Sequence, residues 1–102
     1  MKEVTVQSVE NGILTVCLSG EIAAGNADAF YEEVTAAYAE HGCGMIFDCA
    51  ELAFIDSTTL GTFVKIFKKL QADGKTFRIV NLPQKIKKLF VICSLDTIME
   101  IA

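Results

Sequence analysis

Residues 45–61 read MIFDCAELAFIDSTTLG, and their pattern predicts the central part of the fold. It opens with an apolar run, residues 45–49, that does not alternate and is typical of a central strand covered on both faces. It closes with Asp56-Ser57-Thr58-Thr59, residue types that favour helix starts, directly before an amphipathic segment. The pattern predicts a buried strand, a short connection and then a helix that begins at Ser57 or a neighbour.

The segment after this cluster has helical periodicity up to Ala72-Asp73-Gly74, which ends it. The apolar face expected between residues 58 and 73 consists of Leu60, Phe63, Val64, Phe67 and Leu70. The opposite face carries Lys65, Lys68 and Lys69, which we expect to be solvated.

Upstream, the sequence predicts a β-hairpin and one helix. Residues 4–9 and 13–19 are β-rich and flank Asn11-Gly12, a pair that tolerates the positive φ of a tight reversal. Asn26 offers a side-chain oxygen as the N-cap of a helix that runs to Glu40 or His41 and stops at Gly42. The expected apolar stripe of this helix consists of Ala27, Phe30, Val34, Ala37 and His41.

Downstream, three further elements are expected. Residues 76–81 have the composition of a strand, Pro83 suits the first turn of a third helix, and residues 97–101 could form a last edge strand. The third helix should turn inward Ile86, Leu89, Phe90 and Ile92, and outward Lys85, Lys87 and Lys88. Because each strand-helix-strand unit forces parallel neighbours, the expected fold is α/β. It is a single domain over residues 1–102, with a mixed β-sheet made of an N-terminal hairpin and strand-helix repeats, and with helices packed mainly on one face.

Composition limits the classes of function. The 102 residues are 52% hydrophobic and 22% charged, which is enough apolar surface to offset the entropy of folding. No apolar run approaches the roughly 18 residues of a membrane-spanning helix, and residues 1–12 lack the apolar stretch of a signal peptide. We therefore expect a cytoplasmic protein without membrane insertion. The net charge of −4 argues against direct binding to nucleic acid.

The chain offers little for catalysis. Its four cysteines form no CxxC pair, and with His41 as the only histidine they give no zinc-ligand spacing, so we expect core thiols, no metal and no cofactor. An enzyme with Ser57 or Cys49 as nucleophile would need an activating base, and there is no Gly-x-Ser-x-Gly elbow or Gly-rich phosphate loop. The sequence predicts a binding module and not an enzyme.

Three hydroxyls stand together at the predicted start of the second helix, on Ser57, Thr58 and Thr59. Unpaired backbone N–H groups and the helix dipole favour an acceptor or an anion there, so a phosphate fits this position. Capping alone would account for Asp56, Ser57 or Thr58 with no function attached, but it does not account for their redundancy.

Several segments resemble the STAS domain family, which includes bacterial anti-sigma factor antagonists. Asp56-Ser57-Thr58-Thr59-Leu60-Gly61 resembles the family signature Asp-Ser-Ser/Thr-Gly-Leu-Gly, and Leu18-Ser19-Gly20-Glu21-Ile22 is similar to its Leu-Thr-Gly-Glu-Leu turn. Asn26 stands where the first helix of the family is capped. Leu89-Phe90 with Ser94-Leu95 is similar to its Leu-Phe…Ser-Gly-Leu segment, so the resemblance covers essentially the whole chain.

This resemblance implies a phosphorylation switch. Ser57 becomes the serine that a partner kinase phosphorylates, and the partners are an anti-sigma factor with serine-kinase activity and a PP2C-type phosphatase. The protein itself would be a monomer or a weak dimer. The other residues expected to contact the partner are Asp56, Thr58, Thr59, Gly20, Glu21, Asn26 and Ile66, with Leu95 and Ile98 as further exposed candidates. Phosphorylation would add roughly −1.5 to −2 charges to a site that Asp48, Glu51 and Asp56 already make negative.

Two residues depart from the family pattern. Thr59 occupies the position of a Gly and would put a β-branched side chain into the surface that a kinase approaches, and Ala23 replaces an Asp that commonly follows the Gly-Glu-Leu turn. They leave a second hypothesis open: a STAS scaffold that is not phosphorylated, such as an accessory subunit of a transporter or a sensory complex.

Overall fold

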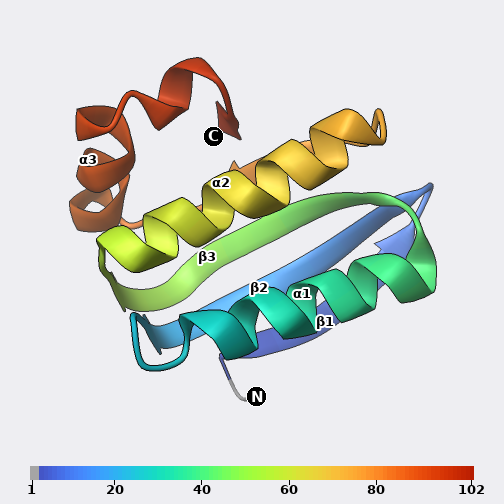
Figure 1. Cartoon of the computed structure of the whole chain (residues 1–102), viewed down its shortest axis with the longest axis horizontal. Coiled ribbons are helices and arrows are strands. Elements are labelled where there is room, and N and C mark those ends of the chain that lie inside the picture. Colours follow the sequence, from blue (N-terminus) through green and yellow to red (C-terminus); the bar gives the residue numbers. More distant parts are fainter. Residues whose placement is uncertain (1–2) are drawn as a thin grey trace.

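A computed structural model describes residues 3–102 and consists of one β-sheet with helices against it (Figure 1). The strands, in their order across the sheet, are β1 (Val4–Glu10), β2 (Ile13–Ile22), β3 (Gly44–Ile55), β4 (Phe77–Val80) and β5 (Glu100–Ile101). The helices are α1 (Ala27–His41), α2 (Ser57–Ala72) and α3 (Gln84–Ile92), followed by a short 3₁₀ turn, Leu95–Thr97. β1 is antiparallel to β2, and all other neighbouring strands are parallel. The mixed sheet and its N-terminal hairpin confirm the predicted α/β fold.

The hairpin turn forms as its residues predict. Asn11 and Gly12 both have positive φ, 54° and 76°, between β1 and β2. The reversal places β2 beside β1, and α1 then returns the chain so that β3 joins β2 in parallel.

The core lies between one face of the sheet and the helices. α1 and α2 run next to each other across that face (Figure 1). At its centre the ring of Phe63 in α2 contacts the rings of three phenylalanines at centroid distances of 5.3, 5.9 and 5.4 Å; these are Phe30, Phe47 and Phe90. Each comes from a different element, so Phe63 joins both other helices to β3.

The helices cover only one face of the central strand. Met45, Phe47 and Cys49 are fully buried, whereas Ile46 and Asp48 between them are half-buried. The prediction that residues 45–49 are covered on both faces is therefore wrong. The predicted short connection is confirmed and consists of Asp56 alone, because β3 is longer than the apolar run and continues to Ile55 before α2 begins at Ser57.

The buried face of α2 differs from the predicted one. It consists of Thr59, Leu60, Thr62, Phe63, Ile66 and Leu70, while Val64 and Phe67 are half-buried. The stripe is rotated because Thr59 and Thr62 are buried with their hydroxyls hydrogen-bonded to carbonyl oxygens of Ile22 and Thr58. Ile66 is consequently 0% exposed, so its prediction as a surface contact is wrong.

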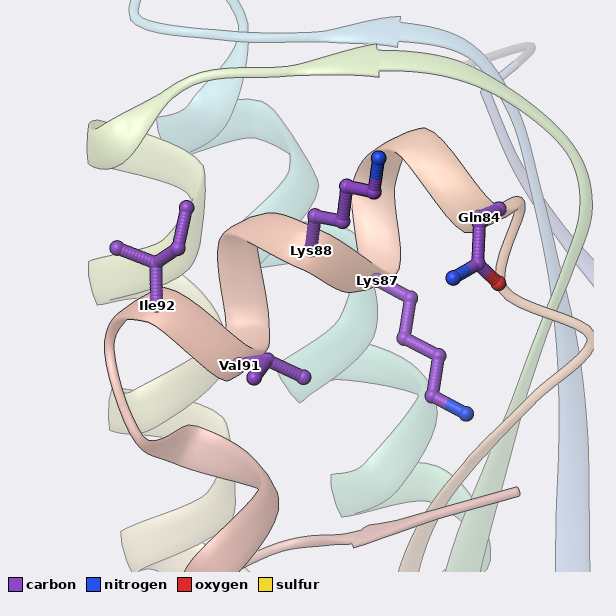
Figure 2. A pocket seen from close by; sticks show the side chains of 5 residues that line it. All are labelled: Gln84, Lys87, Lys88, Val91 and Ile92. Carbon is purple, nitrogen blue, oxygen red and sulfur yellow. The ribbon is translucent and has the colours of Figure 1, made fainter.

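Three further predicted positions are corrected. Leu95 is buried, His41 is exposed at the end of α1, and Ile92 is 77% exposed. Ile92 lies in the last turn of α3, which reaches the core through Ile86 and Phe90, and it lines a hollow on the outside of that helix (Figure 2). Within residues 3–102, no helix is long and apolar enough to cross a membrane.

Candidate partner-binding site at the start of α2

Asp56 organises the start of α2. Its carboxylate oxygen Oδ1 accepts the backbone N–H of Thr59 at 3.1 Å, so it is the N-cap of the helix. The other oxygen, Oδ2, accepts the backbone N–H of Ala24 at 3.0 Å. The bond from the Thr59 N–H, with the bond from the Ala24 N–H, lowers the pKa of Asp56 against the opposing effect of partial burial. Asp56 is therefore ionised at neutral pH and holds two loops together.

The buried side chain of Thr59 attaches α2 to the end of β2. Its side chain is 0% exposed, and its hydroxyl donates to the backbone carbonyl of Ile22 at the end of β2. The prediction that Thr59 contacts the partner is wrong, since the side chain lies under the surface and not on it. The substitution of a family Gly by this Thr adds an anchor between α2 and β2, and it leaves the outer surface of the helix start unobstructed.

Asn26 closes the turn between β2 and α1 and does not cap α1 with its side chain. Its oxygen Oδ1 accepts the Ala23 N–H at 2.8 Å, and its amide Nδ2 donates to the Glu21 carbonyl at 2.9 Å. The predicted capping bond is therefore wrong. Asn26 instead shapes the loop that presents the Ala24 N–H to Asp56.

The structure brings most of the predicted contact residues to one end of the sheet. Ser57 and Thr58 are exposed in the first turn of α2. Glu21, also exposed, pairs in register with Phe54 of β3, and Gly20 pairs with Leu52. Gly20 has φ +72°, a conformation that glycine adopts at no steric cost, at a bulge where β2 bends. These residues, with Asp56, form a continuous edge at the carboxyl ends of two parallel strands.

The acidic residues of β3 are less concentrated than the sequence suggests. Asp48 and Glu51 precede Asp56 by eight and five residues, which in an extended strand correspond to roughly 26 and 16 Å. Burial is the main cause that raises the pKa of the Cys17 thiol, and the negative charges of Asp48 and then Glu51 add to it. Both acids therefore lie near Cys17, along the sheet. Since surface charges are screened beyond about 8 Å at physiological salt, Asp56 is the one of these three acids that acts on Ser57.

The groups that could support catalysis lie elsewhere. His41 is at the last residue of α1, roughly 20 Å along the helix from the loop that contacts Asp56. The Cys49 thiol is 0% exposed, and burial raises its pKa to about 12. A buried neutral thiol is a poor nucleophile. Within residues 3–102, no group of three potential metal ligands is clustered.

A family model and a related protein identify the family of this chain. The family model for the STAS domain matches residues 5–102. The chain belongs to the STAS domain family. The anti-sigma-B factor antagonist of Bacillus subtilis (strain 168) is 32% identical to this STAS domain over 99 residues, which is 97% of this chain and 89% of that protein.

Solved structures share the fold of this STAS domain. A crystal structure of a candidate anti-sigma factor antagonist from Thermotoga maritima matches with a TM-score of 0.88 and 23% identity, over 96% of this chain and 84% of that one. The Bacillus cell fate determinant SpoIIAA in its phosphorylated form matches with a TM-score of 0.73 and 20% identity, over 97% of this chain and 90% of that one.

Two features of the site escape sequence reasoning. The Ala24 N–H is a backbone donor, which every residue except proline carries, so nothing in the sequence marks it as the partner of Asp56. Phe54 is 48% exposed three residues before Ser57, although its apolar neighbours Leu52 and Ile55 are buried. A run of apolar residues with no strict alternation gave no signal for this exposure.

Proposed function

We propose that this STAS domain is an anti-sigma factor antagonist that is switched by phosphorylation of Ser57. Unphosphorylated, it binds an anti-sigma factor with serine-kinase activity, and a PP2C-type phosphatase reverses the modification. It does so in the cytoplasm as one domain, residues 1–102, and catalysis belongs to its partners. The observation that carries the proposal is the exposed Ser57 at the first position of α2, on a motif anchored by Asp56 and Thr59.

The geometry supports a local switch. The Thr59 and Leu60 N–H groups are already bonded to the side chain and carbonyl of Asp56. The Ser57 and Thr58 N–H groups belong to the first helical turn and are the donors that a phosphate at Ser57 would meet, at the positive end of the helix dipole. The modification can therefore be held without refolding the domain.

Charge explains why the phosphorylated form would release its partner. Ser57 follows Asp56, whose lowered pKa keeps it negative, so a phosphate adds roughly −1.5 to −2 charges beside an existing one. A partner surface that fits a neutral hydroxyl then meets concentrated negative charge and a larger group. The relatedness to the anti-sigma-B factor antagonist, at 32% identity over nearly the whole chain, supports the same class of partner.

The proposal is tested by phosphorylation in vitro. The purified chain is incubated with ATP and with each anti-sigma factor kinase of the source organism, and the intact mass and fragment masses are measured. We expect one phosphate on Ser57, lost in Ser57→Ala and retained in the matched variant Thr58→Ala. Absence of phosphate with every kinase, together with a stable complex with a transporter or sensory protein, would favour the scaffold function instead.

A further inference from the structure

A hollow lies between the end of β3 and α3, close to Ser57. Its volume is about 210 Å³, and its lining consists of Ala53, Phe54, Ile55, Lys85, Ile86 and Leu89. Phe54 is 48% exposed, and the exposed Lys85 gives the otherwise apolar lining a positive charge. A second hollow, on the outer face of α3, is lined by residues of that helix alone (Figure 2).

The first hollow lies within reach of a protein that binds at Ser57. Phe54 lies three positions before Ser57, and because a chain spans at most about 3.6 Å per residue, their Cα atoms lie within about 11 Å. A specific protein partner covers about 800 Å² of each surface, which corresponds to a disc of roughly 16 Å radius. A partner of this size centred on Ser57 therefore has the reach to cover Phe54 as well.

We propose that the protein that recognises Ser57 places an apolar side chain, with a carboxylate beside it, in this hollow. The inference rests on the proposed function and adds the chemistry of the partner. Phe54 and Leu89 form walls that exclude water around an apolar group, and such a buried anchor near the interface centre dominates binding energy. The Lys85 ammonium selects an acidic neighbour of that group and disfavours a basic one.

The test uses two variants of the hollow and two matched controls. Phe54→Ser and Lys85→Glu change its wall and its charge. Val9→Ser removes a side chain of similar exposure, 46%, and Lys75→Glu makes the same charge change at an exposed position.

Both controls lie at the other end of the sheet. Val9 pairs with Leu14 and Leu14 with Met45, and Lys75 adjoins Thr76, whose carbonyl accepts the Met45 N–H. Met45 is roughly 30 Å along β3 from Ile55.

Dissociation constants are measured by isothermal titration calorimetry between each unphosphorylated variant and the anti-sigma factor kinase that phosphorylates the wild-type chain. We expect Phe54→Ser and Lys85→Glu each to raise the dissociation constant about tenfold, and the controls to leave it within about twofold. Thermal unfolding of each variant is recorded, and Lys85→Glu, at an exposed position, keeps the test valid if Phe54→Ser unfolds.

A Ser57→Glu variant in the same titrations distinguishes the switch at Ser57 from docking in the hollow. If Ser57→Glu abolishes binding while the hollow variants match their controls, the hollow is not a docking site and the proposed function stands. If Ser57→Glu binds like the wild type, or the wild type binds no kinase, the proposed function falls and the hollow inference with it. If sedimentation without a partner shows self-association that Phe54→Ser removes, the occupant is a second copy and the inference is overturned.

Discussion

The hydroxyl of Thr59 should stabilise the protein measurably, and a single isosteric substitution isolates it. Thr59→Val keeps the size and β-branching of the side chain and removes the donor to the Ile22 carbonyl. Thr59 and Ile22 are both 0% exposed, so water cannot replace the lost hydrogen bond. Leaving a buried acceptor without its donor costs about 1–3 kcal/mol of unfolding free energy. For a domain of this size, each kcal/mol lowers Tm by roughly 4–8 °C.

The neighbouring Thr58 provides the matched control. It is exposed in the same helical turn, so Thr58→Val should change the unfolding free energy by less than about 0.5 kcal/mol. Urea unfolding followed by circular dichroism measures both variants. Equal stability of Thr59→Val and the wild type would contradict the buried hydrogen bond, because it would mean that the Thr59 hydroxyl has no buried partner and faces the surface, as its position in the motif suggests.

Three other regions give expected outcomes. The Tyr38 hydroxyl donates to Asp73 at 2.6 Å, and this bond raises the pKa of Tyr38 from 10.0 to about 12. In urea titrations, the extra stability of the wild type over Tyr38→Phe should therefore be complete below pH 10 and disappear as the pH rises to 12. A constant difference in stability across that range would contradict the bond. A disulfide reagent such as dithionitrobenzoate should label the exposed Cys93 in the folded protein and spare the buried Cys49 until the chain unfolds; rapid labelling of Cys49 would contradict its burial. Ile66→Ala should cost about 2–5 kcal/mol of unfolding free energy because the Ile66 side chain is fully buried. A loss near zero would indicate that Ile66 lies at the surface.

The order of strands and helices was predictable because local chemistry marks each boundary. Asn11-Gly12 requires a tight reversal, Gly42 adopts the left-handed φ of 61° that ends α1, and Asp56 caps α2 as its residue type favours. These signals depend on a few neighbouring residues, so they survive without knowledge of the rest of the fold.

The details of the site depend on tertiary contacts that no local pattern carries. The position of Thr59 in the motif predicts a surface side chain, yet the end of β2 offers its hydroxyl a buried carbonyl. Asn26 stands at a helix start but bonds to backbone groups of its own loop. In each case the deciding partner is a backbone group, which the identity of the residue that carries it does not reveal.

The switch at Ser57 is tested by the affinity of the phosphorylated chain for its anti-sigma factor. The chain phosphorylated on Ser57 and the unmodified chain are each titrated into the anti-sigma factor kinase. The nucleotide bound to the kinase is the same in both titrations. The charge added beside Asp56 predicts binding weaker by about a hundredfold after phosphorylation. Equal affinity of the two forms would contradict the switch.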